Sequence, residues 1–195
     1  MFIARLSFTF GFCVLFAGGC ATIPPEEREA TFKQGVAAYD AGRYAEAFQI
    51  FDSISDEDAA AARNAGLMLR KGQGVPRDPD RALILLEQAA GAGLPTADAD
   101  VGEMLLDGET GKAEPEEALR YLQVAAASHH VIAEYHLGTM YERGLVVPKD
   151  LERARKLYAE AAAGGVEEAK ARLAALDGEQ NRNRTQFSPY NAYGR

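Results

Sequence analysis

The sequence of 195 residues has no tryptophan and is short of positive charge. It carries 21 Lys and Arg residues against 29 Asp and Glu, which gives a formal net charge of -8 at pH 7. A nucleic-acid-binding domain usually presents a basic face, so this balance argues against nucleic acid as a partner. It also argues against holding an anionic membrane surface by charge alone. Alanine supplies much of the 47% hydrophobic share, which favours closely spaced helices over a large aromatic core.

Cysteine is nearly absent, and both copies, Cys13 and Cys20, fall in the first twenty residues. Arg5 precedes an apolar run over 6–16, and small residues follow the run. This order is typical of a secretory signal peptide, which we assign to residues 1–19. The run is too short for a membrane span, which needs about 20 apolar residues. Removal of the signal leaves no pair of cysteines for a disulfide.

The small residues Ala17, Gly18 and Gly19 directly before Cys20 resemble the lipobox of bacterial lipoproteins, although that family usually has leucine in place of Ala17. The resemblance implies that Cys20 receives a diacylglycerol and that the new amino end is acylated, for example with palmitate. Two or more acyl chains hold a protein stably at a membrane. Ala21 after the cysteine implies the outer membrane under the sorting rule of enteric bacteria. The alternative is an ordinary signal peptide cut near Gly19.

Most of the remaining chain repeats itself at a spacing of 36 residues. Small residues mark the aligned positions: Gly66, Gly102 and Gly138; Gly72, Gly108 and Gly144; Ala82, Ala118 and Ala154. Self-similarity at a fixed period predicts an array of like units. Each unit is predicted to hold two helices, the first ended by a glycine and the second begun by a cap. The caps are Asp78, which Pro79 follows, Asp150, and a weaker version at Glu114.

Gly138 lies inside an apolar helical pattern, where glycine costs about 1 kcal/mol relative to alanine. We interpret it as a place where the two helices of a hairpin approach closely, so that a side chain would push them apart.

The third unit resembles a Sel-one-like repeat, a relative of the tetratricopeptide repeat. The positions that match the pattern of that family are Ala133, Leu137, Gly138, Tyr141, Gly144, Val147, Asp150, Ala154, Tyr158, Ala161 and Ala162. We assign three such repeats to residues 58–165, a tetratricopeptide-like hairpin to 30–57 and a capping helix to 166–177. Residues 20–29 are predicted to be an extended tether and 178–195 a disordered tail, whose aromatic residues offer a docking segment as the alternative. His129 stands where the other units have Gly93 and Gly165, so that turn could differ. The fold implied is an all-α, right-handed α/α solenoid.

No group of residues predicts catalysis, a cofactor or a metal. His130 and His136 are six residues apart, not the three or four that place two ligands on one helix face. The many carboxylates fall at helix starts and on exposed stripes. The stretch "GQGVP" has no P-loop lysine and no preceding strand. We therefore predict that the protein is not an enzyme.

The remaining candidate is a surface, the inner face, which the first helix of each hairpin lines in a curved stack. The predicted binding residues on it are Tyr39, Arg63, Leu67, Arg70, Lys71, Glu103, Asp107, Tyr135, Thr139, Glu142 and Arg143. Charges mixed with Tyr and Leu suit an extended peptide or a loop of a partner. The alternative is that these are ordinary solvated side chains.

These observations predict a non-catalytic, lipid-anchored adaptor that faces the periplasm and binds protein partners in the cell envelope. The resemblance brings one precedent, a lipoprotein with such repeats that supports exopolysaccharide export. The alternatives are an accessory that binds glycan or peptidoglycan, for which Tyr39 and Tyr135 give thin support, and a surface lipoprotein that binds a host protein.

Overall fold

The computed structural model describes residues 22–186, and within that range the chain forms nine helices and no strand. The helices are α1 (Pro25–Asp40), α2 (Tyr44–Ser53), α3 (Ala59–Lys71), α4 (Pro79–Gly91), α5 (Pro95–Asp107), α6 (Pro115–Ala127), α7 (Val131–Arg143), α8 (Leu151–Ala163) and α9 (Glu167–Gln186). None of these helices has an apolar stretch long enough to cross a membrane. Residues 1–21, with the signal peptide and Cys20, and residues 187–195, with the aromatic end of the tail, lie outside the described range.

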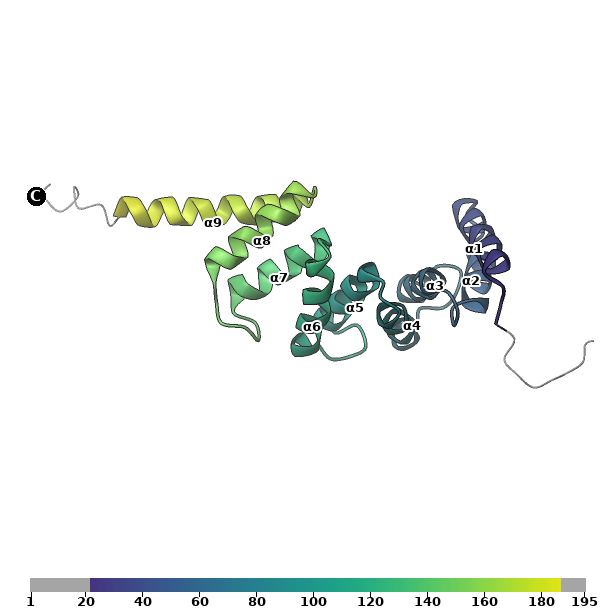
Figure 1. The fold of residues 1–195 in the computed structure, drawn as a ribbon. Helices are drawn as coiled ribbons and strands as arrows, with labels where there is room; N and C mark the ends of the chain where they lie inside the picture. The colour runs from purple at the N-terminus through teal and green to yellow at the C-terminus, as the bar shows by residue number, and fades with distance from the viewer. Residues whose placement is uncertain (1–21, 187–195) are drawn as a thin grey trace, which may run out of the picture.

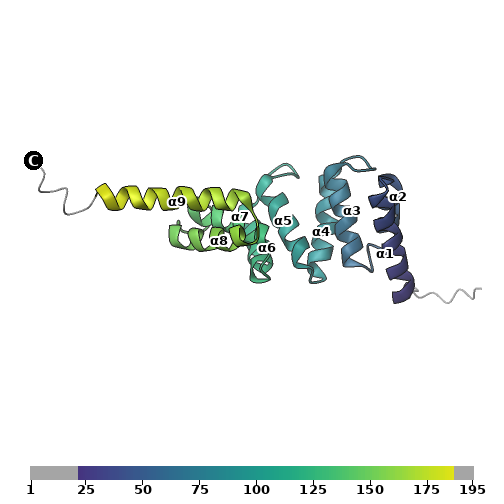
Figure 2. The same ribbon diagram turned by 90° about the horizontal axis from the view of Figure 1, so that it is seen from above.

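The helices pack as four successive hairpins, α1/α2, α3/α4, α5/α6 and α7/α8, and α9 closes the row against α8. The hairpins follow one another along a bent line, and the two ends of the chain lie at opposite ends of it (Figures 1 and 2). In Figure 1 the first and last hairpins rise above the middle ones. This arrangement confirms the predicted all-α solenoid of helical hairpins.

The helix boundaries follow the predicted turn chemistry. Gly72, Gly108 and Gly144 each end a first helix in the left-handed region, at φ of 69°, 67° and 72°. A side chain at a positive φ is strained, which explains the repeated glycine. Asp78 and Asp150 accept hydrogen bonds from the backbone N–H groups of the first turn of the second helix, as predicted. The side chain of Glu114 accepts no such hydrogen bond, so α6 begins at Pro115 without a side-chain cap.

Each hairpin also has a glycine in its first helix opposite a large buried side chain in its second. A Cβ built on Gly138 would lie 2.8 Å from the ring of Tyr158. The equivalent contacts are Gly35 with Phe51 at 2.6 Å, Gly66 with Leu86 at 3.0 Å and Gly102 with Leu122 at 2.6 Å. The interpretation of Gly138 as a point of close approach is therefore confirmed, with one refinement. The glycine makes room chiefly for a side chain of the neighbouring helix rather than for its backbone.

The turn at His129 is the same as its counterparts. His129 adopts φ 58°, in the region that its equivalents Gly93 and Gly165 occupy. Its N–H donates to the carbonyl of Ala126 and the next N–H to that of Ala125, the pattern of the other two turns. The fold thus imposes one turn geometry at this position, whichever residue stands there.

Two predicted boundaries were wrong. Helix α1 begins at Pro25, because proline is well suited to the first helical position, so residues 25–29 are helix and not tether. The N–H of Ile23 donates to Glu57 Oε2 at 2.7 Å, which fixes the chain directly before the helix.

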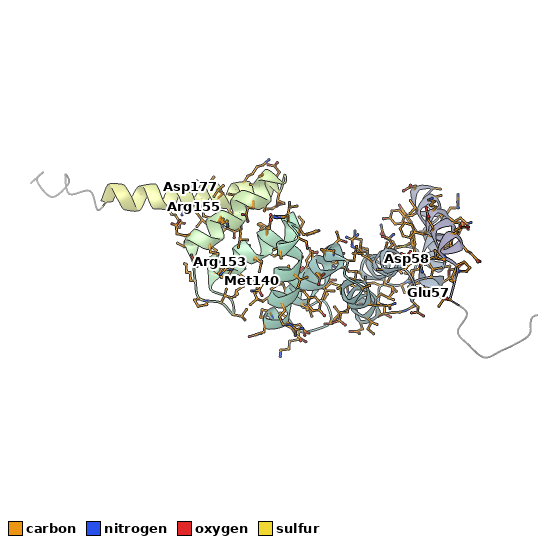
Figure 3. All side chains as sticks on the ribbon, viewed as in Figure 1. Glu57, Asp58, Met140, Arg153, Arg155 and Asp177 are labelled. Carbon is orange, nitrogen blue, oxygen red and sulfur yellow. The ribbon has the colours of Figure 1, made fainter. Side chains whose placement is uncertain are left out.

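At the other end, α9 continues past the predicted capping helix to Gln186. Arg155 holds its middle by an ion pair of 2.9 Å with Asp177 (Figure 3). The residues that follow include Glu, Gln and Arg, which have high intrinsic helix propensity.

Candidate functional site

All eleven predicted binding residues lie on the first helices of the four hairpins, α1, α3, α5 and α7, and we keep the name inner face for the side that they share. The repeat puts them at equivalent positions one helix after another. Leu67, Glu103 and Thr139 are equivalent, as are Lys71, Asp107 and Arg143, at the spacing of 36 residues. The side chains nevertheless differ in what they contact, and only some of them are free to meet a partner.

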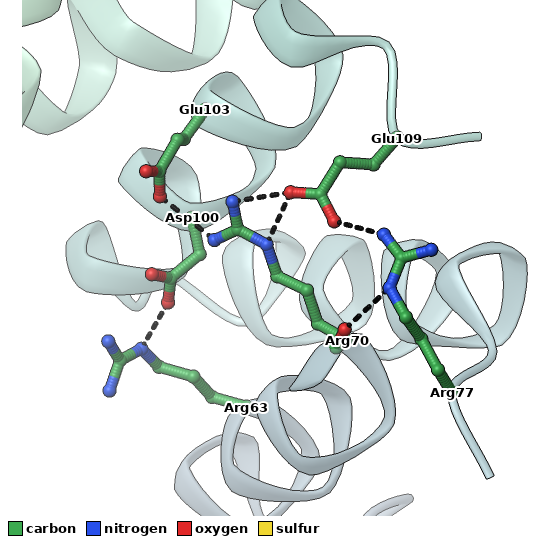
Figure 4. A network of polar contacts seen from close by, with 6 residues as sticks. All are labelled: Arg63, Arg70, Arg77, Asp100, Glu103 and Glu109. Atoms are coloured by element: carbon green, nitrogen blue, oxygen red, sulfur yellow. Dashed lines mark hydrogen bonds and ion pairs between the residues drawn. The ribbon is translucent and has the colours of Figure 1, made fainter. Parts of the chain in front are cut away.

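An ionic network joins α3 to α5 across the middle of the inner face (Figure 4). Arg63 Nε contacts Asp100 Oδ2 at 2.6 Å. Arg70 donates from Nη1 to Glu103 Oε2 at 2.8 Å and from Nε to Glu109 Oε1 at 2.7 Å. Only 14% of the Arg70 side chain is exposed. The network is therefore a structural link between two repeats.

Arg77 extends this network from the loop after α3. Its Nη2 contacts Glu109 Oε2 at 2.9 Å, and its Nε donates to the carbonyl of Arg70 at 3.0 Å. Glu109 thus lies between two guanidinium groups.

The electrostatics of the network follow from this pairing. Burial acts to lower the pKa of Arg70, but the hydrogen bonds from its guanidinium to Glu109 and Glu103 raise it above the usual value. Burial raises the pKa of Asp100, and the neighbouring Arg63 offsets part of that rise.

The structure gives Arg63, Arg70 and Glu103 partners within the protein, and their role in binding a partner stays a prediction. These residues lie on the inner face, but each forms an ion pair with a residue of the neighbouring repeat. Their charges are therefore already paired within the protein. The prediction missed their partners Asp100, Glu109 and Arg77. The separation of Arg63 from Asp100 by 37 residues, one repeat plus one, is the signal that could have revealed the pairing.

A second polar cluster lies where α7 meets α8 and α9. Tyr158 is fully buried, and its ring passes Gly138 so that its hydroxyl donates to Glu142 Oε2 at 2.7 Å. The hydroxyl also lies 3.1 Å from Thr139 Oγ1. Arg172 of α9 donates to both carboxylate oxygens of Glu142. The predicted binding residues Thr139 and Glu142 are thus held by side chains from α8 and α9.

The pKa values in this cluster reflect its burial and its cation. Burial raises the pKa of Tyr158 to about 12. Burial also acts to raise the pKa of Glu142, but the hydrogen bonds from Arg172 and Tyr158 outweigh it and hold that pKa below the usual value. Glu142 therefore stays ionised and paired with Arg172, and this ion pair joins α7 to α9.

Two hollows remain on the inner face. The α1–α3 pocket, with a volume of about 190 Å³, is lined by Val36, Tyr39, Phe51, Asn64, Leu67, Met68, Lys71 and Gln73. The ionic groove, of about 520 Å³, is lined by Arg63, Leu67, Arg70, Lys71, Arg77, Asp100, Glu103 and Glu109. Leu67 and Lys71 belong to both, so the two hollows adjoin. Asp107 and Arg143, at the ends of α5 and α7, are exposed.

Within residues 22–186 no group of three or more His, Cys, Asp or Glu side chains is placed to hold a metal ion. Burial lowers the pKa of both His130 and His136. Glu103 and Asp107 act to raise the pKa of His136 without reversing the effect of burial. Both side chains are therefore neutral at pH 7 and belong to the packing between α5 and α7.

Solved structures resemble this chain over about three quarters of its length. A Sel1 repeat protein from Oxalobacter formigenes is 32% identical, with a TM-score of 0.67 over 73% of this chain and 58% of that one. A protective antigen present in uropathogenic Escherichia coli strains, which displays an SLR fold, is 26% identical, with a TM-score of 0.72 over 76% of this chain and 33% of the antigen.

A putative Sel1 repeat protein from Klebsiella pneumoniae is 16% identical with a TM-score of 0.51, over 77% of each chain, and shares the fold. This chain therefore spans little more than half of the Oxalobacter protein and a third of the antigen. No curated protein sequence matches it significantly.

The Sel1 repeat itself matches residues 59–94, 95–130 and 131–166, which together make up more than half of the chain. These bounds differ by one residue from the three repeats assigned from the sequence, and they correspond to the hairpins α3/α4, α5/α6 and α7/α8. The protein belongs to the Sel1 repeat family.

Proposed function

We propose that this protein is a lipid-anchored scaffold that binds a protein partner on its inner face and holds it in a complex of the cell envelope. Sel1 repeat proteins generally mediate protein–protein interaction. The observation that carries the proposal is the pair of adjoining hollows on the inner face, on a framework that ion pairs hold together. A preformed hollow on a rigid framework binds with less ordering cost than a mobile surface.

A non-catalytic role agrees with the state of the carboxylates on the inner face. Asp100, Glu103 and Glu109 contact arginines, and Glu142 contacts both Arg172 and Tyr158. A general acid or base needs a pKa poised near the working pH and access to a substrate proton. Carboxylates held in structural ion pairs do not offer this.

The proposed anchor is a lipid on Cys20, in the outer membrane and on its periplasmic side. Cys20 is three residues before Ile23, whose backbone is bonded to Glu57. Three residues span at most about 10 Å. A lipid on Cys20 would therefore hold the first hairpin close to the bilayer. The α9 end of the array would then be the end farther from the membrane.

Cell fractionation tests the anchor. Replacement of Cys20 by serine is expected to move the protein from the membrane fraction to the soluble periplasmic fraction, because no acyl chain remains. The matched control is Cys13→Ser, which changes the other cysteine and should leave the protein in the membrane fraction. Retention of the Cys20→Ser variant in the membrane would contradict the proposal.

In-cell crosslinking tests the binding face. A photo-reactive amino acid is placed at Lys71 or at Arg143. Both positions are exposed on the inner face, and neither side chain forms an ion pair within residues 22–186. Gln123, exposed on α6, is the control outside that face. We expect an envelope protein to be captured from the inner face and not from Gln123. Equal capture from all three positions would contradict inner-face binding.

A second candidate is display on the cell surface, where the protein would bind a host protein. The observation in its favour is the similarity to the protective antigen of uropathogenic Escherichia coli. Protease treatment of intact cells separates the two: digestion supports display, and protection supports a periplasmic location.

A glycan partner and a role in exopolysaccharide export have less support in the side chains. Tyr39 contacts Gln73 through its hydroxyl and Tyr44 through its ring, and Tyr135 is tilted against Tyr158. Neither ring presents a free platform for a sugar.

A further inference from the structure

The contact between α1 and α3 on the inner face differs from the contact between α3 and α5. Between α3 and α5, two arginine–carboxylate pairs cross the face. Between α1 and α3, one ion pair of 3.8 Å joins Arg28 to Asp58, the N-cap residue of α3, and the hydroxyl of Tyr39 reaches the loop residue Gln73 at 3.2 Å. The α1–α3 pocket lies at this contact.

The walls of this pocket are apolar. Val36 and Leu67 are half-buried and face it from the two helices, while Phe51 and Met68, each 1% exposed, form its floor. Its volume of about 190 Å³ is larger than a cavity of about 150 Å³ that holds benzene. The pocket therefore has room for one leucine or phenylalanine side chain.

The rim of the pocket carries one charge, that of Lys71, which is the only charged residue in its lining. The adjoining ionic groove has four cationic side chains and three carboxylates. Its three arginines are all paired with those carboxylates, and Lys71 is the cation left over. Lys71 has no ion-pair partner among residues 22–186, and such a cation beside an apolar pocket complements a carboxylate of a partner.

We propose that the α1–α3 pocket binds a large apolar side chain of an extended partner segment and that Lys71 binds an acidic residue next to it. This inference rests on the proposed inner-face function and specifies the chemistry of the partner. The apolar side chain supplies the anchor, because a fully desolvated side chain in a preformed pocket dominates the energy of an interface. Lys71 favours those apolar segments that carry an acidic residue next to the anchor side chain.

Selection of peptides from a random display library on the purified mature chain tests the proposal. We expect enrichment of peptides in which Leu, Phe or another large apolar residue is followed or preceded within two positions by Asp or Glu. Enrichment of basic peptides, or no enrichment at all, would overturn the proposal.

Variants then locate the binding of the selected peptides. Lys71→Glu is expected to weaken binding on the order of tenfold, because attraction becomes repulsion. Val36→Phe is expected to weaken it on the order of a hundredfold by filling the pocket. If Val36→Phe fails to fold, Lys71→Glu still tests the proposal, because Lys71 is exposed and its replacement should not disturb folding. Unchanged affinity in Lys71→Glu would overturn the proposal.

The matched control is Arg120→Glu, the same charge reversal at an exposed position of α6, outside the inner face. It should leave the affinity unchanged, and an equal loss in both variants would show general electrostatic attraction instead of a pocket. A synthetic peptide of residues 187–195 is a second probe. If it binds in the pocket better than the selected peptides, the occupant is the tail of a second copy and the proposal is overturned.

The failure of this inference can be told apart from the failure of the proposed function. In-cell capture from Arg143 without peptide binding at Lys71 would leave inner-face binding standing and remove the pocket. Absence of capture from either position would remove both.

Discussion

The contact between α1 and α3 and the contact between α3 and α5 join equivalent helices, but they are built from opposite chemistry. The first leaves an apolar pocket with one cation at its rim, whereas the second is crossed by Arg63–Asp100 and Arg70–Glu103. The packing inside the hairpins does not explain the difference, because every hairpin has the same glycine opposite a large buried side chain. The repeat therefore fixes the hairpin and leaves the contacts between hairpins free to vary.

One position of the repeat shows this variation most directly. Asn64, Asp100, His136 and Arg172 follow one another at intervals of 36 residues, each on the helix that faces the preceding repeat. Asn64 lines the pocket, Asp100 forms an ion pair with Arg63, His136 is half-buried with a lowered pKa, and Arg172 binds Glu142. The differences between repeats, not their shared residues, are thus the place to look for function.

The largest expected effect comes from the part that all hairpins share. Gly138→Leu should destabilise the protein by about 3 kcal/mol, because the new side chain would collide with the ring of Tyr158. Urea unfolding followed by circular dichroism measures this. Gly91→Ala is the control, since a Cβ there meets no atom within 4 Å. It should be neutral or slightly stabilising, and a stable Gly138→Leu would refute the common hairpin design.

The next effect separates the two contacts. Arg70→Met should lower the free energy of unfolding by about 2 kcal/mol, because Glu103 loses its partner and Glu109 keeps only Arg77. Arg77→Met is the matched control. Arg77 is 53% exposed, so its loss should cost less than about 1 kcal/mol. Equal effects of the two changes would show that the ionic network is a surface feature and does not join the repeats.

The smallest effect concerns the contact between α5 and α7. Burial lowers the pKa of His136 in the folded protein, so between the unfolded and the folded pKa the unfolded chain binds more protons. The stability that neutral His136 contributes is therefore complete above its unfolded pKa and is lost as the pH falls through the lowered folded value. The unfolding free energy of wild type should fall in this window, and that of His136→Asn should fall less. Identical pH profiles would contradict the placement of His136 in the packing.

Much of the fold could be predicted from the sequence, because its signals are local and periodic. Gly72, Gly108 and Gly144 marked helix ends, Asp78 and Asp150 marked helix starts, and the period of 36 residues marked the hairpins. The two boundaries that were wrong lie outside the three repeats, where there is no equivalent segment of the sequence to compare with.

The candidate site was predicted only in part. The helical period placed Arg70 and Lys71 on the same face, but it could not show that Arg70 is bonded to Glu109 from a loop while Lys71 is left unpaired. Such pairing depends on how far each side chain reaches across a contact between repeats, and sequence spacing does not record that distance.

We propose that the α1–α3 contact binds a partner while the α3–α5 contact holds the array together. The most direct test measures two quantities, unfolding free energy and affinity for a selected peptide, on Lys71→Glu and Arg70→Met. We predict that Lys71→Glu lowers the affinity on the order of tenfold and leaves stability within about 0.5 kcal/mol of wild type. Arg70→Met should lower stability more than Lys71→Glu does and affinity less. Loss of peptide binding only in Arg70→Met, with Lys71→Glu unchanged in both quantities, would contradict the account.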